Sequence, residues 1–88
     1  VVGDSMFPNY SSGDRVIIDL SQRELLQDAV YAITDGAISP QIKRLQRVFH
    51  SDPPRVRIIS DNPHYSMEEH LLADVEIVGR VCGIIARR

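Results

Sequence analysis

Short apolar runs separated by turn-forming residues recur along the whole sequence, and they predict a protein built from strands. The predicted strands cover residues 15–19, 29–34, 42–48, 55–60 and 75–86. Asp35-Gly36 predicts a hairpin after the second of them, with the return strand starting near Ala37. Gly79 and Gly83 interrupt the last strand, which predicts a bend or a bulge there.

The segments between these runs are less regular. Val1-Val2 followed by Gly-Asp predicts a strand that ends in a tight turn, with Ser5 at the start of a short helical turn. Residues 21–27 fit either a helical turn or a connecting loop, and residues 65–74 predict a loop with one helical turn at 67–71. Pro40 cannot donate to a sheet ladder, so it marks an irregularity or an edge.

Five or six short strands without a long helix predict a mainly β fold: a small, twisted, partly closed barrel or a pair of sheets. The 88 residues are expected to form one domain, residues 1–88, with a core of Val, Ile and Leu. Because the chain opens with valine in an apparent strand, we expect a fragment or a processed product.

Charge and cysteine content narrow the function classes. A net charge of -2 and a pI near 5.8 argue against direct nucleic-acid binding by this domain. Cys82 is the single cysteine, so an internal disulfide is excluded, a cysteine metal site is not expected, and a cytoplasmic location fits. The sequence contains neither a signal peptide nor an apolar run of membrane-spanning length. We expect no cofactor and no metal.

Ser5 is a candidate nucleophile if a nearby group can take its proton. The histidines, His50, His64 and His70, all lie in polar, turn-like segments where histidines usually face solvent. We therefore do not expect a Ser-His-acid triad.

Lys43 is the alternative base. In a strand of residues 42–48, Lys43 and Leu45 point to the same face. Burial beside apolar side chains lowers a lysine pKa, and a neutral amine can deprotonate Ser5 Oγ. The backbone N–H groups of Asp4 and Ser5 are candidates for an oxyanion hole. On physical grounds alone, a structural turn serine and a solvated strand lysine remain the commoner interpretation.

Four ordered motifs resemble those of one family. Gly3-Asp4-Ser5-Met6-Phe7-Pro8 and the run from Ser12 to Asp19 resemble G-D-S-M-x-P … G-D-x-V-h-h-D, where h is apolar. Lys43-Arg44-Leu45 resembles its K-R-L motif, 38 residues after the serine. Ser60-Asp61-Asn62-Pro63 and Val78-Gly79-Arg80-Val81 resemble the third and fourth motifs. Essentially the whole chain is thus similar to the LexA-like family of self-cleaving repressors, phage repressor C-terminal domains and UmuD-like mutagenesis proteins.

This resemblance implies a catalytic and dimerisation domain with Ser5 as the nucleophile and Lys43 as the general base. It implies cleavage of a peptide N-terminal to the domain, usually after alanine or cysteine and before glycine, stimulated by the RecA filament. Operator DNA is then bound only through the separate N-terminal domain. Homodimers, with higher oligomers left open, are expected through the C-terminal strand. Residues 77–85 fit that role or a core strand equally well, and Cys82 is expected to be buried.

One departure from the family pattern concerns the base. The segment between Gly36 and Lys43 is slightly long and contains Pro40, so a bulge there would redirect Lys43. Two other functions remain open: a dimerisation module with weak or lost cleavage, and a signal-peptidase-like Ser-Lys enzyme, which would require a membrane anchor.

Overall fold

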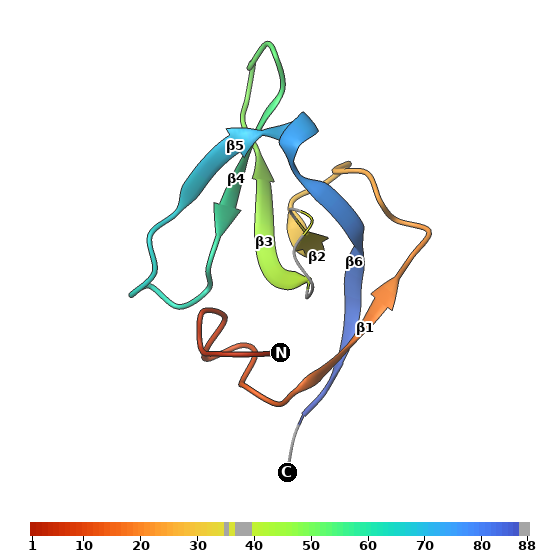
Figure 1. The fold of residues 1–88 in the computed structure, drawn as a ribbon, viewed down its shortest axis with the longest axis vertical. Helices are drawn as coiled ribbons and strands as arrows, with labels where there is room; N and C mark the ends of the chain where they lie inside the picture. Colours follow the sequence, from red (N-terminus) through yellow and green to blue (C-terminus); the bar gives the residue numbers. More distant parts are fainter. Residues whose placement is uncertain (35, 37–39, 87–88) are drawn as a thin grey trace.

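The computed structural model describes residues 1–34, 36 and 40–86, and its fold is mainly β (Figure 1). The elements are β1 (Arg15–Asp19), β2 (Ala29–Thr34), β3 (Gln41–Arg47), β4 (Arg55–Ile59), β5 (Glu68–Leu71), the 3-10 helix η1 (Leu72–Asp74) and β6 (Glu76–Ile85). They form one antiparallel sheet in the order β1-β6-β2-β3-β4-β5. The predicted fold class is confirmed. The structure has one sheet and not a pair of sheets. This sheet is not closed into a barrel, because its edge strands β1 and β5 do not pair with each other.

Most predicted strand boundaries agree with the structure. β1 and β2 match the prediction, and the described ends of β3, β4 and β6 differ from it by one residue. Asp35 and the predicted strand start at Ala37 lie outside the described residues. Pro40 immediately precedes β3, and the β2–β3 register runs without a shift from Ala29↔Leu45 to Ile33↔Gln41. The proline therefore does not redirect Lys43.

Two predicted elements are wrong. Val1-Val2 forms no strand. Val2 is exposed, and the contact of Val1 is with a turn, since its carbonyl accepts from Gly13 N–H at 2.8 Å. Residues 67–71 form no helical turn but contain β5. This edge strand has no apolar alternation because its exposed side chains pair by charge with β4, as in the 2.8 Å Arg55–Glu69 ion pair. Of the two alternatives for residues 21–27, the structure shows the connecting loop.

The main core cluster lies on one face of the central strands. Its buried members are Leu25, Tyr31, Ile33, Leu45, Val56 and Ile77. Strand alternation puts Lys43 on the same face as the fully buried Leu45, as predicted. In the described ranges, no helix is long and apolar enough to cross a membrane.

The last strand is irregular where the glycines predicted it. The register of β6 shifts once against β2 and once against β1, and the second shift leaves Cys82 without a partner position between Val81 and Gly83. Cys82 is exposed, so the expectation that it is buried was wrong. The bulge turns its side chain away from the core, and its Sγ lies 3.4 Å from Ile17 O.

Candidate active site

Ser5 lies in a compact turn at the start of the chain. Gly3 opens the turn with a φ of +80°, a conformation that glycine adopts at little cost. Two backbone hydrogen bonds close it, from Phe7 N–H to Asp4 O at 3.0 Å and from Tyr10 N–H to Met6 O at 2.9 Å. Met6 is 1% exposed and anchors the turn in the interior, while Ser5 itself is half-buried.

Lys43 reaches the same region from β3. Together with the turn of residues 1–6, it lines a pocket of about 620 Å³ that also contains Val16, Ile18 and Tyr65. The amine of Lys43 donates to Ser60 Oγ at 2.8 Å. Within the described ranges, Lys43 Nζ and Ser5 Oγ face one pocket without a hydrogen bond between them.

The surroundings of Lys43 favour its neutral form. Desolvation by burial lowers the pKa of the Lys43 amine, and the carboxylate of Glu68 on β5 acts in the opposite direction. The net direction is downward, which is what a lysine needs to accept a proton near neutral pH.

Three consecutive residues after β4 tie the two halves of the site together. Ser60 contacts Lys43, and the next residue, Asp61, holds Arg44 in a bidentate pair at 2.8 and 3.0 Å. The hydrogen bonds from Arg44 lower the pKa of Asp61, so this carboxylate stays charged. The N–H of Asp61 also points to Met6 Sδ at 3.3 Å.

Asn62 fixes the serine turn directly. Its backbone N–H donates to Ser5 O at 2.8 Å, and its side-chain amide donates to Asp4 O at 3.0 Å. Only 6% of Asn62 is exposed, and its Oδ1 accepts from His64 N–H at 3.0 Å, so its buried polar atoms are satisfied.

The remaining candidate groups are the two oxyanion donors and the three histidines. In the described part of the chain, the N–H groups of Asp4 and Ser5 donate no hydrogen bond, so they are available to an oxyanion. His50, His64 and His70 are all exposed, and the pocket of Ser5 contains none of them.

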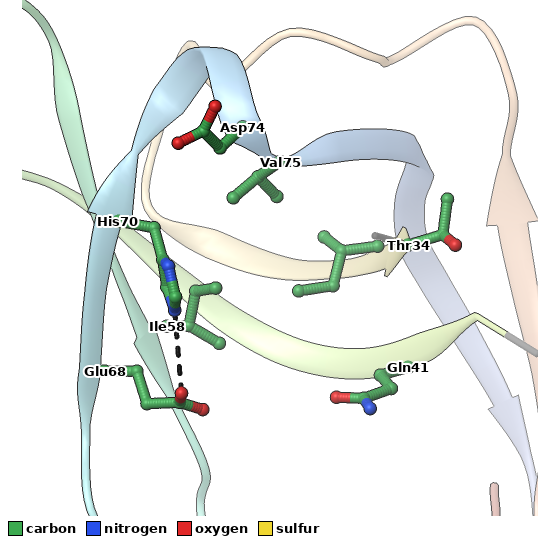
Figure 2. A pocket seen from close by; sticks show the side chains of 8 residues that line it. Thr34, Gln41, Ile58, Glu68, His70, Asp74 and Val75 are labelled. Atoms are coloured by element: carbon green, nitrogen blue, oxygen red, sulfur yellow. Dashed lines mark ion pairs between the residues drawn. The ribbon is translucent and has the colours of Figure 1, made fainter. Parts of the chain in front are cut away.

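A second pocket, of about 210 Å³, lies between β5, the segment after η1 and the facing ends of β2 and β3. Figure 2 shows His70 and Glu68 pointing toward each other there, with His70 Nε2 3.5 Å from Glu68 Oε1. Among the described residues, no cluster of His, Cys, Asp and Glu has the composition of a metal site. Ser5 and Lys43 lie outside this pocket.

Sequence reasoning assigned no role to Ser60, Asn62 or Tyr65. The first two belong to a motif that was noticed only as a point of resemblance, Ser60-Asp61-Asn62-Pro63. Their partners lie 17 to 58 residues away, so no local pattern indicates the contacts.

Comparisons with known proteins place this chain in a family. The Peptidase S24-like family model matches residues 1–82. The repressor protein CI of Enterobacteria phage phi80 is 34% identical over 79 residues, which are 90% of this chain and 32% of that protein. An uncharacterized HTH-type transcriptional regulator of Haemophilus influenzae is 29% identical over 86 residues, which are 93% of this chain and 34% of that protein.

The chain thus spans about a third of the length of these curated relatives. No solved structure matches it significantly. The match over residues 1–82 includes Ser5, Lys43 and the Ser60-Asp61-Asn62 segment. The chain belongs to the Peptidase S24-like family.

Proposed function

We propose that this chain is the C-terminal domain of a phage-type or LexA-like transcriptional repressor, and that it cleaves the linker of its own protein. The observation that carries the proposal is the shared pocket of Ser5 and Lys43, where burial lowers the pKa of the lysine. The family match supports a peptidase of this kind, and the similarity to a phage repressor supports the repressor role. As a repressor domain, it acts in the cytoplasm.

The proposed reaction uses four groups of the chain. Neutral Lys43 takes the proton of Ser5 Oγ while this oxygen attacks the scissile carbonyl carbon. The N–H groups of Asp4 and Ser5 stabilise the oxyanion. The protonated Lys43 then gives its proton to the leaving amine as the peptide C–N bond breaks, and water deprotonated by Lys43 hydrolyses the acyl-serine. Because the linker is tethered, its effective concentration at the pocket is high.

The remaining parts of the proposal concern partners. A second copy of the chain forms a dimer, which brings two N-terminal domains to operator DNA. The RecA filament stimulates cleavage, which separates those domains from the dimerising part. The same fold without cleavage would serve as a dimerisation module only.

The test is self-cleavage of the full-length protein that contains this sequence, followed by electrophoresis from pH 7 to pH 10.5 with and without activated RecA. We expect the rate to rise about tenfold per pH unit below the pKa of Lys43 and then to level off. Ser5→Ala and Lys43→Ala should abolish cleavage, whereas Ser12→Ala, in an exposed turn, should not change it. A wild-type protein that stays intact under all these conditions leaves the dimerisation module as the function.

A further inference from the structure

Tyr65 contacts both halves of the candidate site. Its hydroxyl donates to Asp4 Oδ1, and its ring centroid lies 5.8 Å from Lys43 Nζ. It also lines the pocket that contains Ser5 and Lys43. Its own backbone is held in place, because Tyr65 N–H donates to Asn62 O at 3.1 Å.

We propose that Tyr65 is a positioning residue for Ser5 and Lys43: its hydroxyl holds the turn that carries Ser5, and its ring shields the lysine amine from water. The inference rests on the proposed function for the catalytic roles of Ser5 and Lys43. The two contacts of Tyr65 involve different parts of its side chain, so the hydroxyl contact can be removed alone and then compared with loss of both.

The hydroxyl acts on the turn through Asp4, the residue before Ser5. The backbone carbonyl of Asp4 already accepts from Phe7 N–H and from the Asn62 amide. The Asp4 carboxylate is therefore the acceptor left for Tyr65. The hydrogen bond to Asp4 raises the pKa of Tyr65 above its usual value. The protonated hydroxyl is the form that donates to Asp4, so this contact favours the neutral tyrosine.

The ring acts on the lysine by covering it. At 5.8 Å the attraction between a ring face and a cation is near the limit of its range, so exclusion of water is the larger effect. The other groups around Lys43 are Glu68 on β5, Ser60 after β4 and Tyr31 opposite on β2. The hydroxyl of Tyr31 donates to Gln27 O. The carboxylate of Asp4, which lines the same pocket, accepts the hydrogen bond of the Tyr65 hydroxyl. Loss of the ring exposes the amine to water and raises the pKa of Lys43.

Two variants separate these effects. Tyr65→Phe removes the hydroxyl and keeps the ring, so the maximal cleavage rate should fall about 3- to 10-fold, equivalent to one hydrogen bond, with an unchanged pH midpoint. Tyr65→Ala removes both, so the midpoint should also move to higher pH. Phe49→Ala is the control, because Phe49 is an 85% exposed aromatic residue on the β3–β4 connection.

A second measurement does not depend on cleavage. The pKa of Lys43 can be followed in this chain by carbon-13 NMR of the lysine Cε, assigned with Lys43→Arg, and it should be higher in Tyr65→Ala than in wild type and Tyr65→Phe. If wild type cleaves but the Tyr65 variants change neither the rates nor this pKa, the proposed function stands and the inference is wrong. If wild type fails to cleave while Tyr65→Ala raises the pKa, the proposed function fails and the shielding of Lys43 by Tyr65 is upheld.

Discussion

The side chain of Lys43 is a flexible four-carbon chain, and a hydrogen bond to one hydroxyl group directs its amine. Ser60 Oγ accepts from Lys43 Nζ at 2.8 Å, and Ser60 in turn follows β4 directly, so a rigid strand supports it. The neighbouring Arg44–Asp61 pair fixes the same segment from the other side of β3. A side chain held in this way loses little entropy when it meets the nucleophile.

Ser60→Ala should therefore slow self-cleavage without unfolding the protein. Loss of one hydrogen bond should raise the activation free energy by about 0.5–1.5 kcal/mol, which corresponds to a rate about 2- to 12-fold lower. Ser60→Thr keeps the hydroxyl and should retain most of the rate. Ser66→Ala, an exposed serine on the same β4–β5 connection, is the matched control. Equal rates for Ser60→Ala and wild type would show that the Lys43–Ser60 contact plays no part in cleavage.

The predictability of the site differs among its residues for a physical reason. The alternation of β3 indicated that Lys43 shares a face with Leu45, and the structure confirms that face because Leu45 is fully buried. The contacts of Ser60, Asn62 and Tyr65 depend on how the β4–β5 connection approaches the turn of Ser5. Such long-range approaches are set by tertiary packing, which leaves no periodic signal in the sequence.

At the scale of elements, the approach of β1 to β6 determines where the pocket wall stands, because Val16 and Ile18 line it. Gly79 makes this approach possible. A Cβ added there would lie 2.6 Å from Asp19 O and 2.6 Å from Ile18 Cγ2. A Cβ is essentially never found this close to another heavy atom, so one of the two strands would have to move.

Gly79→Ala should consequently destabilise the fold by about 1–3 kcal/mol, the usual range for overpacking. Gly83→Ala is a closely matched control on the same strand, since the one tight contact of its added Cβ would be the flexible end of Ile17, Cδ1, at 3.2 Å, and its other contacts would be ordinary ones. The midpoint of urea unfolding, followed by circular dichroism, should fall clearly for the first variant and little for the second. Equal midpoints for the two variants would contradict this account.

Other elements show what the sequence reveals about strands. Strands rich in β-branched and apolar residues follow from the sequence, as the half-buried β1 and the β2 strand, buried on both faces, do. β5 was missed because it is an exposed edge strand of mostly charged and polar side chains, such as Glu69 opposite Arg57 on β4. The exposure of Cys82 was missed because two glycines indicate that a bulge forms but not which residue it displaces.

At the scale of the molecule, an open sheet has edges, and β1 is one of them. The register pairs Ile17 with Gly83 and Arg15 with Ile85, so Ile17 and Ile85 share one face. They are 51% and 57% exposed. Val16 and Ile18, on the opposite face of β1, line the pocket of Ser5. A dimer formed through the face of Ile17 and Ile85 would leave the pocket accessible to the linker.

If this face forms the repressor dimer, charge placed on it should produce monomers. A fully buried isoleucine contributes about 1.5–3 kcal/mol, and two-fold symmetry counts each substitution twice. Ile85→Asp should therefore raise the dimer dissociation constant about 100-fold or more, as measured by sedimentation equilibrium. Phe49→Ser is the control, because the β3–β4 connection lies at the opposite end of the molecule from the C-terminal end of β6 (Figure 1). A wild-type chain that remains monomeric at high micromolar concentration would contradict the proposed dimer, whereas a dimer weakened equally by both variants would place the interface elsewhere.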